Sequence, residues 1–593
     1  MLENQMLQFL NSDFQQFTQQ DKQDKQDENT ETEVPNNSQR QMRVKSFEEK
    51  PANKPLNLIF QMLLQKKTQK RQQIKVDPKS IPLSINLSVQ VQELPIIRKI
   101  MEKNEWKKAH NFDGDILWCG PDNVQQAKQF TYDFAMVFMN LCISRIPGAK
   151  LISTKKETTS IMDKMRQYFP SIYNFYPKTY TMPEDLHEFI EDFEKKDGIS
   201  YIAKPDKGTQ GQGIFIVSQI EDLFNNGVKD ISYIKKNYII QEYISNPLLL
   251  DDKKFDFRLY VLITSLKPLI AYINEEGLAR LCTENYQDIT SSNLSNVYMH
   301  LTNYSLNKNS QNFIIHPPDF QKINLGTKRT YTSAKKTLMK MGIDVPKLKL
   351  RIEQTIVRFL YGIAPFLLNS TREIYQDKWE KANCFHVIGF DILIDRDLKP
   401  WIIEINANPS LEITQVVQNS NGSKRVETSS LDAYVKTKVI EDAFIIAVKT
   451  PQEQIEQIGK GKYCNSYKMI IDGQPPIENL DLFYKLVDLY SNLCGLRYGN
   501  LNQMRFCRLA NNPQLINDLL IKSDYDLIYK KIQLKSLQPD LNFLGFLEAI
   551  ESISEKLLKR KASNYTLQKA VTYVVNTALK APSQQQRPLT AKR

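Results

Sequence analysis

Two acidic residues and an amide in the second half of the chain form the clearest candidate for a chemical site. Apolar and polar residues alternate there around a polar turn, which predicts a β-hairpin. Glu404 and Asn406 are two apart on the second strand, so their side chains point to the same face. If Ile394 pairs with Trp401 across the turn, Asp391 stands opposite Glu404, with the two Cβ atoms roughly 5 Å apart.

Two carboxylates this close repel each other unless a cation neutralises them. Oxygen ligands of this kind suit magnesium, which keeps several waters and takes further ligands from nucleotide phosphates. A surface hairpin with solvated acids is the alternative, but the large apolar residues beside the acids argue against it. We therefore predict a magnesium site made by Asp391, Glu404 and Asn406.

A glycine-rich segment lies between two short apolar runs in the first half of the chain. It lacks the Lys-Ser/Thr pair of a P-loop and leads into a strand rather than a helix, so neither a P-loop nor a Rossmann turn fits. Such a turn can instead lie over a triphosphate, because its backbone N–H groups approach the oxygens closely and Lys204 adds positive charge. An ordinary hairpin is the alternative. The candidate phosphate-binding residues are Lys204, Gly208, Thr209, Gln210, Gly211, Gly213 and Ile214.

An alternating strand between these two segments carries further charges. Asp256, Arg258 and Tyr260 fall on one face of it. Arg258 can clamp a carboxylate or a phosphate with two parallel hydrogen bonds, although an ion pair at a sheet edge would explain the same pattern. The polar segment 299–305 follows, with more hydrogen-bonding side chains than a turn needs. His300 in isolation would more often be structural than catalytic.

The elements that must position these residues alternate between strands and helices. From about residue 81 to 450, short β-type runs alternate with helical patterns, which indicates an α/β or α+β enzyme body. Residues 479–560 have helical spacing and predict a small α-helical module. The expected strands include 201–204, 214–217, 238–240, 259–263, 389–394 and 401–405.

Composition narrows the class of protein. The 593 residues are too many for one compact core, and 79 Lys+Arg against 67 Asp+Glu give a net charge of +12, which favours an acidic partner. No Cys/His finger spacing or RNA-binding motif points to nucleic acid. The 7 cysteines show no CxxC spacing, which indicates a reduced compartment, and no apolar run is long enough to span a bilayer. We expect a cytoplasmic or cytoskeletal protein that binds neither nucleic acid nor membrane.

Short motifs follow one another in a fixed order between about residues 95 and 445: Ser144-Arg-Ile-Pro-Gly148 with Lys155, Lys204-Pro205 with Gly208-Thr-Gln-Gly-Gln-Gly-Ile214, Gln241-Glu-Tyr-Ile244, Asn246-Pro-Leu-Leu249, Lys254-Phe-Asp-Phe-Arg258, Gly277-Leu-Ala-Arg280, His300-Leu-Thr-Asn-Tyr-Ser305, Gly389-Phe-Asp391 and Trp401-Ile-Ile-Glu-Ile-Asn-Ala-Asn-Pro-Ser410. In order and spacing these motifs resemble the tubulin tyrosine ligase-like family. Within that family the sequence is most similar to the polyglutamylase branch, and the last motif is the most suggestive.

The resemblance implies an ATP-grasp fold that holds ATP between its central and C-terminal parts. Lys155 and Lys204 would bind phosphates, and residues 241–244 would hold adenine through their backbone. The metal ligands it implies are again Asp391, Glu404 and Asn406. The nucleotide-binding residues it implies, besides the glycine-rich segment, are Lys155, Lys204, Gln241, Glu242, Tyr243, Ile244, Lys254, Arg258 and Asn303. The residues implied to line the amino-acid and acceptor site are Arg258, Arg280, His300, Thr302 and Asn303.

We expect the resulting domains to follow one another in a simple order. The helices at the C-terminal end also resemble a degenerate EF-hand-like module without the DxDxDG loop that calcium needs. The predicted domains are a disordered polar tail at 1–80, an N-terminal α/β ligase subdomain at 81–180, a central ATP-grasp subdomain at 181–255, a C-terminal ATP-grasp subdomain with the metal site at 256–450, a linker at 451–478, the α-helical module at 479–560 and a basic tail at 561–593.

The implied activity is that of an ATP- and magnesium-dependent carboxylate–amine ligase. It would add glutamate to side-chain carboxylates in the acidic C-terminal tails of tubulin through an acyl phosphate, with free glutamate as co-substrate and tubulin or microtubules as partner. We expect a monomer in the cytoplasm and on the cytoskeleton, including the axoneme or basal body of a cilium. A glycine ligase of the same family and a catalytically inactive microtubule-binding scaffold stay open as alternatives. A tyrosine ligase is less expected, because that enzyme lacks such long appendages.

Overall fold

The computed structural model divides the chain into two units, Met1–Lys70 and Arg71–Arg593, and all described residues belong to the second. Of the N-terminal tail predicted at 1–80, only 73–80 are described, and disorder is the wrong prediction there, because they form β1 (Gln73–Ile74) and a 3-10 helix (Pro78–Ser80). The described residues are 73–87, 95–110, 113–119, 141–196, 198–208, 210–220, 222–225, 238–317, 319, 325–418, 423–474, 480–495, 500–536, 538–558 and 566–580.

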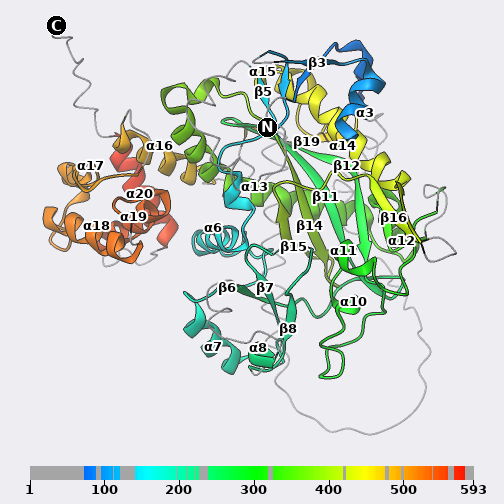
Figure 1. Ribbon diagram of the computed structural model, residues 1–593. Helices are drawn as coiled ribbons and strands as arrows, with labels where there is room; N and C mark the ends of the chain where they lie inside the picture. Colours follow the sequence, from blue (N-terminus) through cyan, green and yellow to red (C-terminus); the bar gives the residue numbers. More distant parts are fainter. Residues whose placement is uncertain are drawn as a thin grey trace, which may run out of the picture. The chain divides into compact units, whose positions relative to one another are not determined.

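A large, mainly antiparallel sheet forms the body of this unit (Figure 1). Its centre is the pair of long strands β11 and β12, and only the β1–β18 pair is parallel. The strands lie in the order β1, β18 (Tyr463–Cys464), β19 (Tyr467–Asp472), β12 (Leu269–Leu281), β11 (Lys253–Leu266), β14 (His386–Ile394) and β15 (Pro400–Asn406), with β10 (Leu249–Leu250) on β11 and β13 (Lys328–Thr330) on β12.

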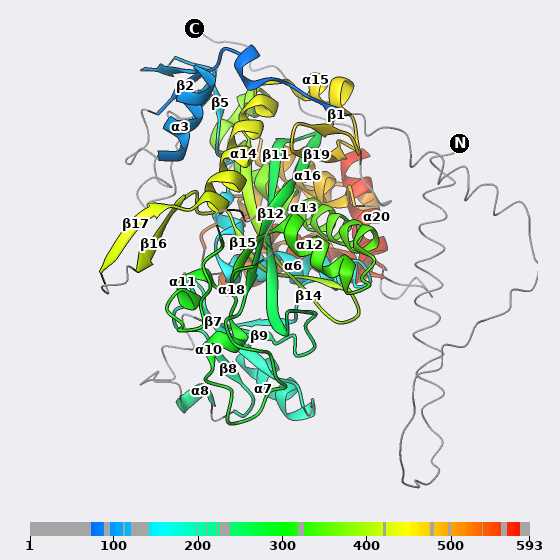
Figure 2. The same cartoon turned by 90° about the vertical axis from the view of Figure 1, so that its right-hand side faces the viewer.

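Helices cover both faces of this sheet, which explains why its central strands are apolar on both sides. On one face α13 (Val345–Tyr375) packs against the strands, and Phe359 meets Phe390 edge to face at 5.3 Å. On the other face α14 (Ser430–Ala447) covers Tyr260 and its apolar neighbours (Figure 2). Asp256, Arg258 and Tyr260 alternate onto this second face, so the charged residues continue the row of apolar ones along the strand.

A smaller antiparallel sheet carries the glycine-rich segment. Its strands are β6 (Thr179–Thr181), β9 (Tyr238–Glu242), β7 (Tyr201–Pro205) and β8 (Phe215–Val217), in that order. An aromatic cluster holds it to α7 (Leu186–Lys195), because Phe189 contacts Tyr180 at 5.3 Å and Tyr201 at 5.2 Å between ring centroids. The short α8 (Asp222–Asn225) follows β8.

The remaining elements around the body are short. A parallel sheet near the N-terminal end of the unit has the order β3 (Lys107–Ala109), β2 (Ser84–Asn86), β4 (Ile116–Leu117) and β5 (Cys142–Ile143). The helices are α3 (Pro95–Asn104), a 3-10 helix (Ala149–Ile152), α6 (Lys155–Tyr168), α10 (Val297–His300), α11 (Tyr304–Asn307), α12 (Tyr331–Lys340) and a 3-10 helix (Gln376–Lys381), and β16 (Thr414–Gln418) pairs with β17 (Lys424–Thr428) as a separate ribbon.

Residues 451–472 of the linker predicted at 451–478 are instead part of the body. They form α15 (Pro451–Glu453), a π-helical turn (Gln454–Ile458), β18 and β19. β19 pairs along β12, and Tyr467 and Met469 are fully buried. The linker prediction was wrong because a glycine- and lysine-rich stretch at 459–462 precedes an apolar strand that completes the sheet.

The C-terminal module consists of two helix–loop–helix units and a further helix. The backbones of Leu501 and Leu541 exchange N–H···O bonds of 2.7 and 3.1 Å, which join the two units. The module reaches Lys580, so the basic tail predicted from residue 561 is helical over part of its length. Its helices are α16 (Leu482–Cys494), α17 (Gln503–Phe506), two 3-10 turns (Cys507–Asn511 and Pro513–Leu515), α18 (Lys522–Ser536), α19 (Phe543–Leu558) and α20 (Leu567–Lys580).

The prediction of a mixed α/β fold is confirmed by these sheets and helices. Each of the strands expected between residues 201 and 405 is present. Among the helices of the described residues, none combines the length and the apolar character needed to cross a bilayer.

Candidate active site

The predicted hairpin is present as β14 and β15, and Asp391 lies directly opposite Glu404, as predicted. The turn differs, because Ile394 pairs with Pro400 and not with Trp401. A β-bulge at Ile403 adds one unpaired residue and restores the predicted register at the acids. The bulge also turns the Ile403 carbonyl toward the smaller sheet, where it accepts a hydrogen bond of 3.3 Å from Lys204 Nζ.

Charges of opposite sign alternate across three neighbouring strands at this point. Arg258 on β11 pairs with Asp391 on β14, with Nη2 2.8 Å from Oδ2 and Nε in contact with Oδ1. Arg280 on β12 reaches both acids, with Nη2 2.7 Å from Asp391 Oδ2 and Nε 2.7 Å from Asp256 Oδ1. Thr302 donates a further hydrogen bond of 2.5 Å to Asp256. The Arg258 ion pair therefore lies at the centre of the sheet, not at an edge.

Asp391 stays ionised because of these arginines. Burial alone would raise the pKa of the Asp391 carboxyl, but Arg258 and Arg280 outweigh burial and hold that pKa below its usual range. Asn406 Nδ2 adds a long contact of 3.4 Å to the same carboxylate. In this state the two guanidinium groups supply the neutralising charge that the sequence assigned to a cation.

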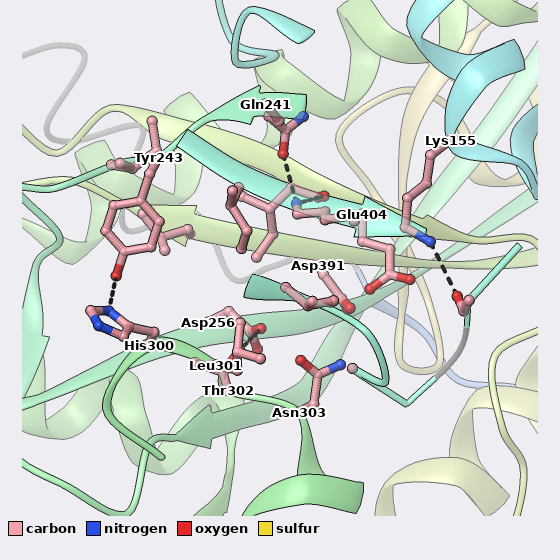
Figure 3. A pocket seen from close by; sticks show the side chains of 18 of the residues that line it. Lys155, Gln241, Tyr243, Asp256, His300, Leu301, Thr302, Asn303, Asp391 and Glu404 are labelled. Atoms are coloured by element: carbon pink, nitrogen blue, oxygen red, sulfur yellow. Dashed lines mark hydrogen bonds between the residues drawn. The ribbon is translucent and has the colours of Figure 1, made fainter. Parts of the chain in front are cut away.

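Glu404 has different surroundings from Asp391. Its side chain is half-buried, and within the described part of the chain no hydrogen bond or ion pair holds its carboxylate. Figure 3 shows the Asp391 and Glu404 carboxylates beside each other in the pocket, with Asn303 facing them from the segment between α10 and α11. A half-buried carboxylate without a protein partner is available to a cation or to a protonated ligand.

Three lysines face the same pocket. Lys204 and Lys254 are buried, and burial lowers the pKa of each to about 8. Lys204 Nζ is held by Gln241 Oε1 at 2.6 Å, and Lys254 Nζ lies 3.9 Å from the centre of the Tyr243 ring. Lys155 adds to the lowering of the Lys204 pKa, and Lys204 adds to that of Lys254, so an anion bound between these ammonium groups would be favoured.

The glycine-rich segment closes over one side of the pocket. Lys155 Nζ, at the first residue of α6, donates to the Gly208 carbonyl at 3.2 Å, and Ser305 Oγ donates to the Gln210 carbonyl at 3.1 Å. Gly211 has φ +79°, and a Cβ there would stand 2.5 Å from Leu306 Cδ1. Glycine is favoured here because its φ is positive and because a Cβ would have to displace the Leu306 side chain of α11.

His300 is neutral and both of its ring nitrogens are engaged. Burial lowers the pKa of His300 to about 4, with Lys254 adding to the effect. The Asn293 carbonyl lies 3.0 Å from Nε2, so Nε2 carries the proton, and Nδ1 accepts a hydrogen bond of 2.9 Å from the Tyr243 hydroxyl. His300 therefore orients Tyr243 and is no general base.

Most of the predicted site residues line this one pocket: Lys155, Lys204, Gly208, Gln210, Gly211, Ile214, Gln241, Glu242, Tyr243, Ile244, Lys254, Arg280, His300, Thr302, Asn303, Asp391 and Glu404. Arg258 lies behind Asp391, and Asn406 beside it, outside the lining. Gly213 lies at the base of the loop, where its carbonyl accepts from the Tyr238 hydroxyl at 3.1 Å. Thr209 lies outside the described residues.

Sequence reasoning missed several lining residues: Pro177, Ile202, Pro205, Gln212, Asp256, Leu301, Leu393 and Ile403. The sequence placed Asp256 on the strand face of Arg258 but did not assign it to the site. The apolar ones carry no signal that separates a pocket wall from ordinary core. Ile202, Leu301, Leu393 and Ile403 give the pocket apolar surface that a planar ring can contact.

The donor set fits a magnesium–nucleotide pair. In the described part of the chain, no group of three or more His, Cys, Asp and Glu side chains is arranged to hold a metal by itself. Two carboxylates and an amide suit a cation that takes its other ligands from waters and phosphates. Glu404, whose carboxylate forms no hydrogen bond or ion pair with the described residues, can give such a cation an oxygen ligand, and the three lysines can neutralise phosphates.

The part of the sequence that forms this pocket matches known proteins. Residues 139–455, more than half of the chain, match the family model described as "Tubulin-tyrosine ligase family". A "Probable beta-tubulin polyglutamylase" of Tetrahymena thermophila is 32% identical over 374 residues, 62% of this chain and 29% of the relative.

Two vertebrate relatives give the same picture. The human "Tubulin polyglutamylase TTLL11" is 35% identical over 327 residues, 54% of this chain and 45% of the relative. The Danio rerio "Tubulin polyglutamylase ttll6" is 34% identical over 304 residues, 51% of this chain and 35% of the relative. This chain therefore spans less than half the length of each of these three relatives. On the strength of the matched region, the chain belongs to the tubulin-tyrosine ligase family.

Proposed function

We propose that this chain is an ATP- and magnesium-dependent ligase that adds glutamate to glutamate side chains in the acidic C-terminal tails of tubulin. The single observation that carries the proposal is the pocket between the two sheets, where three lysines and a glycine-rich segment lie opposite Asp391 and Glu404. The names of the relatives, all of them tubulin polyglutamylases, support the choice of substrate.

ATP would lie between the smaller sheet and β14–β15. Lys155, Lys204 and the glycine-rich segment would contact its phosphates, because these groups bring positive charge and backbone N–H groups to one side of the pocket. The strand that contains Gln241 would hold the adenine through its backbone, and the apolar lining would contact the ring. The Tyr243–His300 hydrogen bond would fix this end of the pocket, since the neutral imidazole accepts from the hydroxyl.

Magnesium would be held by Glu404 and Asp391, with Asn406 beside them. Asp391 is already neutralised by Arg258 and Arg280, so the unpartnered Glu404 would lose least on binding the ion. When bound, the ion would neutralise charge on the β- and γ-phosphates during phosphoryl transfer.

The reaction of such a ligase has two balanced steps. An oxygen of the acceptor carboxylate attacks the γ-phosphorus of ATP, ADP leaves, and an acyl phosphate forms. The neutral amine of the incoming glutamate then attacks the acyl carbon, and an amide bond forms as the nitrogen loses a proton. Inorganic phosphate leaves with the electron pair of the broken C–O bond and takes up that proton. Lys204 and Arg280 would stabilise the negative charge that develops in both steps, because both lie on the pocket wall with the acids.

The net charge of +12 suits acidic substrates, since both the acceptor tail and the incoming amino acid are anionic. We propose that the chain acts as a monomer on microtubules, in the cytoplasm and at the axoneme or basal body of cilia. A glycine ligase would need a different pocket for the incoming side chain, and an inactive scaffold would need no intact set of lysines and acids.

A purified-ligase assay separates these functions. Tubulin, ATP and magnesium are incubated with the full chain and with labelled glutamate or labelled glycine, and label on tubulin is counted. The proposal predicts incorporation of glutamate, none without ATP, and none with Glu404→Gln. Incorporation of glycine alone would establish the glycine ligase, and incorporation of neither, with intact microtubule binding, would establish the scaffold.

A further inference from the structure

The C-terminal module shares apolar contacts with the body of the unit, which holds the large sheet. Phe483 on α16 is fully buried and meets Tyr168 on α6 edge to face, with ring centroids 5.1 Å apart. Phe543 on α19 meets Phe366 on α13 in the same way at 5.3 Å. All four side chains belong to one continuous cluster that also contains the strands of the large sheet. The module and the body therefore share a core.

An ion pair fastens this contact to α6 in particular. The carboxylate of Glu551, on α19, lies 2.7 Å from Lys164 Nζ and accepts a hydrogen bond of 2.9 Å from the Tyr168 hydroxyl. Only 18% of the Lys164 side chain and 12% of the Glu551 side chain are exposed, so water screens the pair weakly. Two residues one turn apart on α6 thus share one acceptor.

The other end of α6 touches the pocket. Lys155 is the first residue of the helix, and its Nζ holds the Gly208 carbonyl of the glycine-rich segment. The backbone N–H of Lys156 holds Asp206 Oδ1 at 3.0 Å. Lys155 and Lys164 lie about 14 Å apart along the helix axis. A helix of this length moves as a rod, so a shift at the Glu551 end moves Lys155 and the segment it holds.

We propose that Glu551 is a positioning residue for the nucleotide site, through which the C-terminal module sets the placement of α6 and therefore of Lys155 over the phosphates. The inference rests on the proposed function, because it takes the pocket to bind ATP. Within the module, Tyr490 donates a hydrogen bond of 3.0 Å to the Leu541 carbonyl and Tyr529 donates one of 3.1 Å to the Leu501 carbonyl. Both hydrogen bonds lie inside the module, and none of the residues that form them is on α6.

Nucleotide binding to the full chain tests the proposal. The dissociation constant of a non-hydrolysable ATP analogue with magnesium is measured by calorimetry for the wild type, Glu551→Ala and Glu551→Gln. Glu551→Ala should raise it about threefold to tenfold. Glu551→Gln keeps an oxygen that can accept from both donors and should raise it less. In the ligase assay the KM for ATP should rise in the same order, while kcat at saturating ATP stays within about twofold.

Two controls separate positioning from a loss of stability. Glu548 lies on the same helix and pairs with Lys535 at the surface, so Glu548→Ala should leave both constants unchanged. Tyr529→Phe removes a hydroxyl inside the module, far from α6, so it should lower the melting temperature without changing the nucleotide constant. If Glu551→Ala lowers the melting temperature but leaves the nucleotide constant at the wild-type value, as Tyr529→Phe should, the proposal is wrong. A wild type that binds no nucleotide would overturn the proposed function itself.

Discussion

At the scale of single residues, Asp391 and Glu404 face each other across two strands but differ in what depends on them. Asp391 is 1% exposed and forms ion pairs with two arginines. Glu404 is half-buried, and its carboxylate forms no hydrogen bond or ion pair with the described residues. A carboxylate that balances buried cations contributes to the stability of the fold in addition to any role in ligand binding. A carboxylate without a partner is free for a ligand alone.

The two acids should therefore separate activity from stability. Glu404→Gln should abolish glutamate transfer and leave the melting temperature unchanged. Asp391→Asn should abolish transfer and also destabilise the fold by about 3–5 kcal/mol, because Arg258 and Arg280 would stay buried with less negative charge. Thermal unfolding beside the ligase assay measures both. Transfer that survives Glu404→Gln would remove this residue from the site.

The buried lysines predict a proton uptake. Burial lowers the pKa of Lys204 and of Lys254 to about 8, so near that pH a large part of each is neutral in the free protein. Anionic phosphates favour the charged form and raise both pKa values, so binding an ATP analogue at pH 8 should take up protons, and its affinity should fall as the pH rises from 7 to 9. Calorimetry with EDTA, in buffers of different ionisation enthalpy, measures the uptake. Proton release, or no dependence on buffer, would contradict this assignment.

The residue types at the site could be read from the sequence, but their partners could not. The period of two placed Glu404 and Asn406 on one face, and it placed Asp256 with Arg258. Nothing local shows that β11 lies next to β14, so the pairing of Arg258 with Asp391, 133 positions away, needed the structure. For the same reason the burial of Lys254 under Tyr243 was not foreseen.

At the scale of elements, the predicted register of the hairpin is one residue wrong at the turn, and the bulge on β15 restores the predicted pairing at the acids. The prediction paired Ile394 with Trp401 and reached Asp391 opposite Glu404 without a bulge. In the structure Ile394 pairs with Pro400, one residue earlier than predicted, and the unpaired Ile403 makes up the difference. A bulge has no reliable sequence signal when the inserted residue is as apolar as its neighbours.

The glycine-rich segment offers a matched pair of variants. Gly211 and Gly198 both have positive φ, +79° and +78°, so alanine costs about 1–2 kcal/mol of backbone strain at either. Only at Gly211 would the new Cβ meet Leu306 and push the segment from α11. Gly211→Ala should therefore weaken binding of an ATP analogue at least several-fold, and Gly198→Ala should leave it unchanged. Equal effects of the two variants on binding would show that the segment does not contact the nucleotide.

At the scale of the whole described unit, the body that holds the large sheet and the C-terminal module share one hydrophobic cluster. The helical spacing of the module was visible in the sequence, since apolar residues of α19 recur at turn intervals. Its attachment was not visible, because the residues that join the two, Tyr168, Phe366 and Phe483, look like core residues of separate domains. The family match extends from 139 to 455, so it too says nothing of this contact.

A shared core predicts unfolding as one unit. Phe483→Ala removes a fully buried ring at the junction and should cost about 3–5 kcal/mol, with body and module melting in a single transition. Met504 lies on the same module but is 76% exposed, so Met504→Ala should change stability by less than about 0.5 kcal/mol. Calorimetric unfolding of the three proteins measures this. Two separate transitions in the wild type would mean that the module is an independent domain.

The central claim, ligation of glutamate to tubulin tails, is tested most directly by mass spectrometry of the tail peptides. Purified tubulin is incubated with the full chain, ATP, magnesium and glutamate, and the tails are cleaved and fragmented. The account predicts added glutamate residues joined through the side-chain carboxylates of tail glutamates, and none when ATP is omitted or when Glu404→Gln replaces the wild type. Unmodified tails with the wild type, or tails that carry glycine in place of glutamate, would contradict it.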